Sequence, residues 1–357
     1  MEIKGQSSFY AHRWLKYVSP KFRFLVKTFP FLTFFVKTKF VGRFLNNFEK
    51  NTKPDEKVIA DIKKYAPDVV VAGPVCYRQS SADLEYLKAA KALDLPTVVL
   101  VMTWDTLTTK GIFHVIPDLL FVWNEAQIKE AEEHHGIGRE KIKIVGAPFF
   151  DKWFNLIKSI GTTPPTPLLN KEGGEGGGYI LYLGSSDNIA PDERWLIKEI
   201  KESVDVPVVF RPHPANFKIY QDFNMPGVTI SPKNGQMPKT KESLQDLRDV
   251  FRNASAIVGV NTSAMIDAIV AGFPVIALER EEFLRTQMLA QHYQHLRDTG
   301  AVLVSLSKED FPLIFSRLRA GVDSTKLARE QFIKNFIRPR GLEKSAGESA
   351  AEETELL

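Results

Sequence analysis

Cysteine is nearly absent from this chain, since Cys76 is the single one among 357 residues. One cysteine excludes an internal disulfide framework, and it excludes a metal site built from several thiolates. No secretory signal is recognisable in the sequence. We therefore expect a reducing compartment and a cytoplasmic protein.

Several nucleotide-binding and metal-binding motifs are also missing. The sequence contains no G-x-x-x-x-G-K-[ST] and no G-x-G-x-x-G after a strand, which disfavours P-loop and dinucleotide-binding proteins. It has no Asp-x-Asp pair, so a diphosphate clamped by a metal ion is disfavoured as well. We expect neither a metal site nor a separate cofactor.

Long apolar runs are missing from the first 50 residues, where the longest uncharged run, TFPFLTFFV, has nine residues. A membrane-spanning helix needs about 20. These 50 residues hold ten Lys or Arg, two Glu and ten of the 25 Phe. Two interpretations stay open: a helical region whose Phe side chains pack on the protein's own core, or peripheral contact of residues 9–48 with the inner face of the cell membrane.

Nucleic acid is not an expected partner. The first 50 residues carry a net charge of +8. The whole chain carries +4, so the remaining residues together carry about −4. That remainder shows no RNA-binding motif, and a negative body does not attract a phosphate backbone.

From residue 55 onward, helical and strand patterns alternate. Alternation of this kind predicts parallel sheets with helices on their faces, an α/β fold of two Rossmann-type domains. The expected divisions are a basic Phe-rich segment, a first domain, a Pro/Gly-rich linker, a second domain and a disordered polar tail, at 1–55, 56–158, 159–178, 179–337 and 338–357. The strands are expected within 68–73, 96–102, 118–123, 141–147, 179–185, 206–210, 228–232, 256–260 and 274–278.

Three polar loops follow strands of the second domain: LGSSDN at 183–188, RPHPAN at 211–216 and GVNTSAMIDA at 259–268. The carboxyl ends of parallel strands meet at one edge of a sheet, and ligands bind there. Two prolines stiffen the second loop around a histidine. We therefore predict that the three loops together form a nucleotide-phosphate site.

Each loop offers a different chemistry. A helix that begins in the third loop presents unpaired N–H groups and the positive end of its dipole to an anion, and a carboxylate one turn later suits a ribose hydroxyl pair. Arginine, histidine and serine side chains donate to phosphate. The competing interpretation is an ordinary helix cap beside a structural loop. The predicted site residues are Ser185, Ser186, Arg211, His213, Asn261, Thr262, Ser263 and Asp267.

With these motifs, the chain resembles the GT-B-fold glycosyltransferases of bacterial surface-carbohydrate biosynthesis. RPHP followed by NTSAMIDAIVAGFPVIAL is similar to CDP-glycerol glycerophosphotransferases, to the His-Pro-motif Kdo- and sialyl-transferases and to UDP-N-acetylglucosamine 2-epimerase. The likeness also includes TWDTLTTKG, VGAPFFDKW and residues 117–137, and it spans roughly residues 65–300. It implies that 261–263 form a phosphate loop and that Asp267 is the ribose carboxylate.

The resemblance gives the first domain the acceptor side of the reaction. A transfer to a hydroxyl needs a base. Asp105 and then Glu125 are the candidates for it, with the alternative that Asp105 only caps the following turn. His134 and His135 are predicted to face solvent at the end of a helix. GT-B proteins open with a strand near residue 1, so this domain is expected to lack an initial strand-helix-strand unit.

The predicted function is a glycosyltransferase that moves a sugar or polyol phosphate to a hydroxyl of a cell-surface glycan or a lipid-linked acceptor. The donor would be CMP-, CDP- or UDP-linked. His213 would offset charge on the leaving nucleotide as a third catalytic residue. Two alternatives stay open: an enzyme resembling UDP-sugar 2-epimerase, and a catalytically reduced nucleotide-binding or membrane-associated protein.

Overall fold

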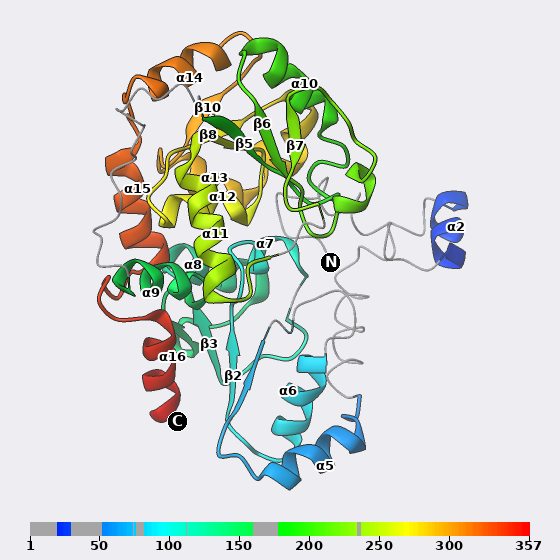
Figure 1. Cartoon of the computed structure of the whole chain (residues 1–357). Helices are drawn as coiled ribbons and strands as arrows, with labels where there is room; N and C mark the ends of the chain where they lie inside the picture. The colour runs from blue at the N-terminus through cyan, green and yellow to red at the C-terminus, as the bar shows by residue number, and fades with distance from the viewer. Residues whose placement is uncertain are drawn as a thin grey trace. The chain divides into compact units, whose positions relative to one another are not determined.

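The computed structural model describes residues 20–29, 52–73, 75, 82–111, 113–159, 178–233 and 237–357. The chain forms two compact units, unit 1 with Met1–Asp151 and Lys334–Leu357, and unit 2 with Lys152–Ile333 (Figure 1). Cys76, nearly all of the predicted linker 159–178 and most of residues 9–48 lie outside the description.

Unit 1 is built on a four-stranded parallel sheet in the order β1-β2-β3-β4. Its middle strands are buried runs of Val, Leu and Phe, as expected of a parallel sheet covered on both faces. The first strand of the described residues is β1. The strands are β1 Val70–Ala72, β2 Thr97–Leu100, β3 Leu119–Val122 and β4 Ile142–Ile144, which confirms the four predicted strands.

The helices of unit 1 begin and end at recognisable signals. Asn124 caps α8 by accepting a hydrogen bond from the Gln127 N–H at 3.1 Å, and Gly136 ends it in the left-handed conformation at φ 66°. The helical elements are α2 Pro20–Thr28, α5 Glu56–Tyr65, α6 Ala82–Ala92, α7 Thr106–Thr109, α8 Glu125–His135, η1 Arg139–Lys141, η2 Pro148–Phe150 and α16 Ala346–Glu355.

Unit 2 contains a six-stranded sheet in the order β10-β9-β8-β5-β6-β7, and all its strand pairs are parallel. The order runs outward in both directions from β5 and β8, which defines a doubly wound Rossmann-type sheet. The strands are β5 Tyr179–Leu183, β6 Val208–Arg211, β7 Val228–Ile230, β8 Ala254–Gly259, β9 Val275–Leu278 and β10 Leu303–Ser305. The first five were predicted and β10 was not.

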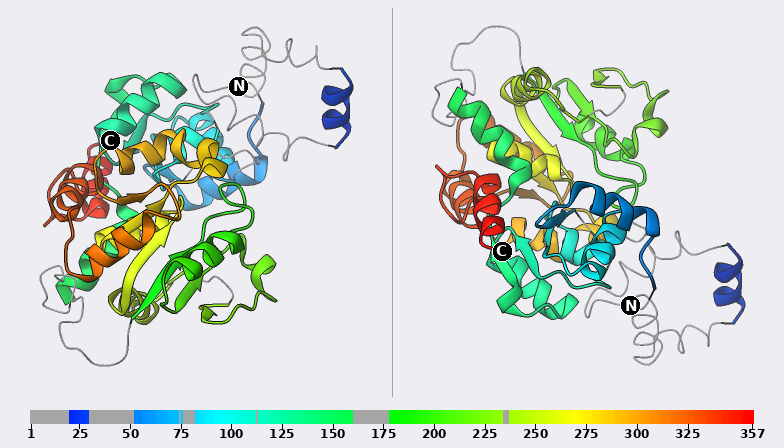
Figure 2. Two further views of the ribbon diagram at one scale, coloured as in Figure 1. Left: turned by 90° about the horizontal axis from the view of Figure 1, so that it is seen from above. Right: turned by 90° about the horizontal axis from the view of Figure 1, so that it is seen from below.

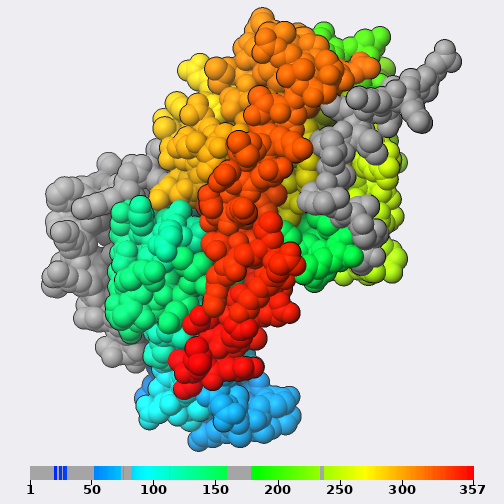
Figure 3. Space-filling view, turned by 90° about the vertical axis from the view of Figure 1, so that its left-hand side faces the viewer, coloured from blue at the N-terminus to red at the C-terminus, as the bar shows by residue number. Residues whose placement is uncertain are grey.

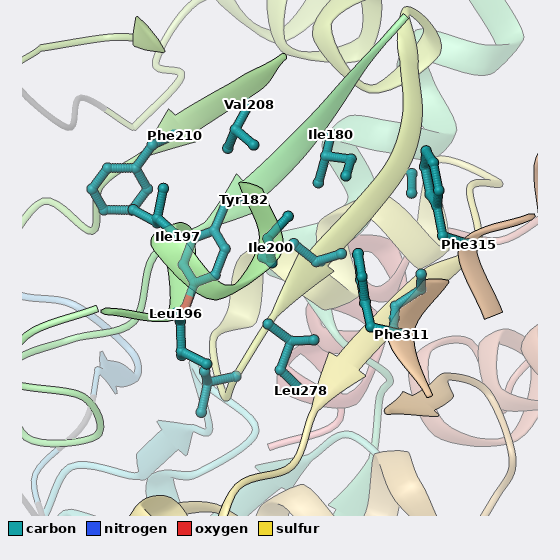
Figure 4. Close-up of a cluster of buried hydrophobic side chains, with 14 of the residues drawn as sticks. Ile180, Tyr182, Leu196, Ile197, Ile200, Val208, Phe210, Leu278, Phe311 and Phe315 are labelled. Atoms are coloured by element: carbon teal, nitrogen blue, oxygen red, sulfur yellow. The ribbon is translucent and has the colours of Figure 1, made fainter. Parts of the chain in front are cut away.

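Helices lie on both faces of this sheet (Figures 1 and 2). On one face α10 and α14 pack against the strands, and Figure 4 shows Leu196, Ile197 and Phe311 from these helices in that core. On the other face α11 and α12 pack on β8. The helical elements are α9 Asp151–Ser159, α10 Arg194–Ser203, η3 Phe217–Tyr220, α11 Lys241–Arg252, α12 Ser263–Val270, η4 Glu281–Phe283, η5 Leu284–Met288, α13 Gln291–Arg297, α14 Phe311–Arg319, α15 Lys326–Phe332 and η6 Ile333–Ile337.

The prediction of a disordered tail at 338–357 is wrong. The chain leaves unit 2 at Ile333 and returns to unit 1, where α16 lies at the surface beside the residues coloured green (Figure 3). A capping box between Ser345 and Glu348 starts α16. The buried Arg338 forms an ion pair with Asp151 at 2.7 Å. The predicted end of the second domain at residue 337 therefore moves to 333.

Asp151 and Gly146 hold this returning segment against unit 1. The carboxylate of Asp151 also accepts hydrogen bonds from the N–H groups of Ala346 at 3.2 Å and Gly347 at 2.9 Å. Gly146 has φ 90°, and a Cβ there would lie 3.0 Å from the carbonyl oxygen of Ile337. Only glycine adopts this conformation without strain and leaves room for the passing chain.

Candidate functional site

The carboxyl ends of β5 and β8 form the switch point of the unit 2 sheet. These strands are neighbours, yet the chain continues from β5 to β6 on one side and from β8 to β9 on the other. Ligands of doubly wound sheets bind outside this point, because the two loops diverge there and leave a crevice. All three predicted loops leave strands at this edge, after β5, β6 and β8.

The loops after β5 and β8 touch each other. The backbone N–H of Asn261 donates to Oγ of Ser185 at 3.3 Å, and both residues are buried. The side-chain amide of Asn261 contacts the Thr286 carbonyl oxygen at 2.8 Å and Nε2 of His292 at 3.1 Å. The sequence therefore placed Ser185 and Asn261 correctly at one edge, while their bonds serve to fix the two loops.

Gly184 brings the loop after β5 against the loop after β6. Its N–H donates to the carbonyl oxygen of Arg211 at 2.9 Å. A Cβ at position 184 would lie 3.0 Å from the His213 nitrogen and 3.1 Å from the Arg211 oxygen. A side chain at this position would crowd both backbone atoms, so glycine favours this close approach and RPHP lies directly beside Ser185 and the half-buried Ser186.

The RPHP loop has a fixed shape. Nδ1 of His213 accepts a hydrogen bond from the Ala215 N–H at 3.0 Å, so the neutral ring carries its proton on Nε2. The buried Asn216 donates to the Ala190 carbonyl oxygen at 3.2 Å. Burial lowers the pKa of the Arg211 guanidinium, and the charge of Asp267 opposes this shift. Arg211 and Asp267 therefore lie near enough for their charges to act on each other, while their binding roles stay predictions.

Thr262 and Ser263 start α12 at this edge. The Thr262 hydroxyl accepts from the Ala264 N–H at 3.5 Å and so acts as the N-cap, which was the competing interpretation of this motif. Ser263 is the first helical residue and is half-buried. The helix still directs its dipole toward the switch point, and a cap does not exclude an anion there.

Asp267 lies one turn into α12 and is 5% exposed. Its Oδ1 accepts a hydrogen bond from Nε1 of Trp153 at 2.6 Å and pairs with Nζ of Lys152 at 3.3 Å. Burial raises the pKa of Asp267, whereas Lys152, Trp153 and Arg211 act to lower it. The sequence analysis missed the two α9 residues, although VGAPFFDKW was part of the family resemblance.

Glu193 is a second buried carboxylate that the sequence analysis missed. Its oxygens accept from the Ser185 N–H at 3.0 and 3.1 Å and from the Tyr182 hydroxyl at 3.1 Å. Burial raises the pKa of Glu193 to about 8, and the three hydrogen bonds only partly oppose it. This carboxyl group therefore fixes the loop after β5, and the Ser185 N–H that it binds is not available to a ligand.

In unit 1, Asp105 organises its own loop after β2. Its carboxylate accepts from the hydroxyls of Thr103 and Thr109, each at 2.7 Å, and pairs with Nζ of Lys110 at 2.9 Å. It is also the N-cap residue of α7, although its side chain makes no cap bond to the backbone. These contacts agree with the competing turn interpretation, and the role of Asp105 as a base stays a prediction.

Glu125 and His135 lie at opposite ends of α8. The Glu125 side chain is 72% exposed and 3.7 Å from Arg139, so its surroundings are those of an ordinary surface carboxylate. His135, predicted to face solvent, is instead half-buried, with Nε2 2.8 Å from the Leu107 carbonyl oxygen. Burial lowers its pKa to about 4. The neutral ring therefore anchors the loop that carries Asp105.

No family model matches the chain, and no curated protein sequence matches it. Solved structures do. Methanocaldococcus jannaschii UDP-GlcNAc 2-epimerase in complex with UDP-GlcNAc and UDP is 18% identical, with a TM-score of 0.54 over 84% of this chain and 79% of that one. The Neisseria meningitidis UDP-GlcNAc 2-epimerase bound to UDP-GlcNAc is 14% identical, with a TM-score of 0.53 over 84% of this chain and 79% of that one. S. aureus MnaA with UDP is 12% identical, with a TM-score of 0.52 over 87% of this chain and 80% of that one.

These similarities establish the fold. Two units, each a parallel α/β sheet and the second doubly wound, form the GT-B-like architecture of two Rossmann-type domains that the sequence predicted. Identities of 12–18% extend the likeness no further than the fold.

Proposed function

We propose that this chain is a nucleotide-sugar enzyme, and specifically a glycosyltransferase that moves a sugar or polyol phosphate to a hydroxyl of a cell-surface glycan. The observation that carries the proposal is the meeting of the three loops at the switch point of unit 2. There the Ser185–Asn261 contact joins the loops after β5 and β8, and the hydrogen bond from Gly184 to the Arg211 carbonyl oxygen joins the loops after β5 and β6.

The groups at this edge suit a nucleoside diphosphate. Arg211, the Nε2–H of His213 and the amino end of α12 would meet the phosphates, and Asp267 would accept from the ribose. When the bond to the transferred group breaks, negative charge grows on the phosphate of the leaving nucleotide. Donors held in place before the reaction stabilise that charge without reorganisation, which is the largest single contribution in many enzymes. No metal is needed in this scheme.

An enzyme like UDP-sugar 2-epimerase is the second candidate. It is favoured by two of the similar solved structures, which are UDP-GlcNAc 2-epimerases with UDP-GlcNAc bound. A nucleotide-binding protein without turnover is the third. These three candidates differ in what happens to the donor when no acceptor is present.

Turnover assays separate the candidates. UDP-, CDP- and CMP-linked sugars would be incubated with and without a glycan or lipid-linked acceptor, and the free nucleotide and the sugar products identified by NMR. A transferase releases nucleotide in proportion to added acceptor. An epimerase inverts C2 without acceptor, and that result would refute transfer. Binding with neither reaction would leave the third candidate.

The same assay tests the acceptor base. We propose Asp105 first and Glu125 second, since a hydroxyl acceptor must lose its proton. Asp105→Asn is expected to lower kcat by about 10²–10⁴-fold, the usual contribution of a positioned general base. Glu125→Gln is the comparison variant. Unchanged kcat in Asp105→Asn would remove Asp105 from the mechanism and leave it as the organiser of its loop.

We further propose that residues 9–48 contact an anionic membrane surface, where a lipid-linked acceptor would be reached. No helix within the part of the chain that the structure describes is long and apolar enough to cross a membrane. On α2 and directly after it, however, Phe24, Leu25 and Phe29 are 71%, 44% and 46% exposed. The sequence of 9–48 contains eight Lys or Arg and neither Asp nor Glu. Aromatic rings and cations together suit the headgroup region of an anionic bilayer.

Vesicle flotation checks this contact. The protein is expected to float with vesicles that contain phosphatidylserine and not with pure phosphatidylcholine, and high salt should release it. Phe24→Ser/Phe29→Ser should weaken binding, while Leu327→Ser, at a residue 69% exposed on α15, should not. Failure to bind phosphatidylserine vesicles at low salt, or equal binding by both variants, would contradict the proposal.

A further inference from the structure

Trp153 is a fully buried tryptophan whose indole N–H donates its hydrogen bond to one carboxylate oxygen. Its ring stacks on Phe251 of α11, with the centroids 5.8 Å apart and the planes at 29°. Nε1 donates to Oδ1 of Asp267 at 2.6 Å. Stacking fixes the ring, and the ring in turn fixes the oxygen, so the orientation of the Asp267 carboxylate is set by a residue 114 positions earlier.

Lys152 acts on the same side of the carboxylate. Its Nζ lies 3.3 Å from Oδ1 of Asp267, the oxygen that Trp153 already holds. Oδ2 receives no hydrogen bond from the residues that the structure describes, although Asp267 is only 5% exposed. Oδ2 is not one of the fully enclosed atoms that lack a partner, so it still reaches accessible space. Because Oδ2 is accessible, a ligand hydroxyl can replace water as its donor.

Burial and the neighbouring groups act on Asp267 in opposite directions. Burial alone raises its pKa, and the cations Lys152 and Arg211 oppose that shift together with the indole donor. An ionised carboxylate accepts hydroxyl hydrogen bonds that are roughly twice as strong as those between neutral groups. The arrangement thus provides an oriented carboxyl acceptor, with a cation beside it, at one helical turn from the amino end of α12.

We propose that Trp153 is a positioning residue for ribose recognition: by holding Oδ1 with Lys152, it turns Oδ2 of Asp267 toward the hydroxyl pair of a bound nucleotide. This inference rests on the proposed function, because it takes the occupant of the switch point to be a ribonucleotide. It makes the indole N–H, and not the bulk of the ring, the determinant of the preference for ribose over a deoxygenated sugar.

The test compares ribose and dideoxyribose ligands. Dissociation constants of UDP and CDP and of their 2′,3′-dideoxy forms would be measured by calorimetry for wild type, Trp153→Phe and Asp267→Asn. Hydrogen bonds to charged groups predict a preference of wild type for the ribose form of about 10- to 100-fold. Trp153→Phe keeps a ring against Phe251 and loses the donor. It should bind the ribose form more weakly, bind the dideoxy form as wild type does and lose most of the preference, as should Asp267→Asn.

A matched control and the wild-type measurement separate the outcomes. Trp195→Phe removes an indole of the same unit that stacks on Phe283 at 5.8 Å, and it should keep the preference. Equal weakening of both ligands in Trp153→Phe would assign Trp153 a purely structural role and overturn the inference while the proposed function stands. If wild type binds neither UDP nor CDP, a site for these two nucleotides is refuted and the inference falls with it.

Discussion

Replacing Arg338 with methionine is expected to destabilise unit 1 by about 3–5 kcal/mol, the usual cost of breaking a buried ion pair. The Arg338 side chain is 3% exposed, lies 2.7 Å from Asp151 and also donates to the Lys344 carbonyl oxygen. Methionine fills a similar volume but removes the charge. Asp151 then keeps only its bonds to Ala346 and Gly347 at the start of α16.

Hydrogen exchange followed by mass spectrometry locates this effect. Amides of α16 and of β3 in unit 1 should exchange faster in Arg338→Met, and amides of β5 and β8 in unit 2 should not change. Arg340→Met is the control, since it breaks the more exposed pair with Glu353 and should cost less than about 1 kcal/mol. Rapid exchange of residues 346–355 in wild type would contradict the packing of α16 on unit 1 and would support the predicted disordered tail.

The free energy of unfolding of wild type is expected to fall as the pH rises, because Glu193 ionises. Replacing Glu193 with glutamine should remove this fall. The pKa of Glu193 is raised by burial from 4.5 to about 8 in the folded chain. The folded state therefore binds one more proton than the unfolded state between these values. Stability from this group is complete below about pH 4.5 and falls by about 1.4 kcal/mol per pH unit until about pH 8.

The surroundings of Glu193 isolate this titration. Tyr182 and Tyr220 face the carboxyl group, and their own pKa values are raised, so both stay neutral over this range. The nearby Asp192 and Arg194 pair with each other at 2.6 Å. Glutamine imitates the protonated acid, since it keeps an oxygen for the Ser185 N–H and the Tyr182 hydroxyl and does not ionise.

Urea unfolding at a series of pH values measures the difference. Glu193→Gln should match wild type near the acid end and exceed it increasingly toward pH 8. Glu202→Gln is the control on the same helix, because this exposed carboxylate pairs with Lys308 and its pKa is lowered. Parallel stability curves for wild type and Glu193→Gln across this range would show that Glu193 is ionised and stabilised by something other than these contacts.

Sequence periodicity predicted the sheets because their strands are buried runs bounded by glycine, proline and polar residues. The meeting of the loops that carry Ser185, Arg211 and Asn261 followed from one topological rule about strand ends. Neither inference needed a side-chain contact. Both rest on the parallel order of strands, which an alternating helix-strand pattern implies.

Contacts between distant segments were not predictable in this way. Nothing local in DKW shows that Trp153 will meet Asp267, and Glu193 looks like an ordinary acid near the start of α10 until burial is known. Disorder was wrongly predicted for residues 338–357 because their polar composition is typical of disordered segments. One local signal was present, the Ser345-x-x-Glu348 capping box, and it would have indicated α16.

The central claim is that the loops after β5, β6 and β8 bind a nucleotide phosphate. Its most direct test is the stabilisation of wild type, His213→Ala and Arg211→Met by CMP, CDP, UDP, GDP and ADP, with Arg252→Met, an exposed arginine at the end of α11, as control. A ligand at a hundredfold excess over its Kd stabilises the folded state by about 2.7 kcal/mol. We expect one pyrimidine nucleotide to stabilise wild type and Arg252→Met, and the other two variants to lose most of that effect. If no nucleotide stabilises wild type, or if His213→Ala and Arg211→Met respond as wild type does, these loops are not a nucleotide site.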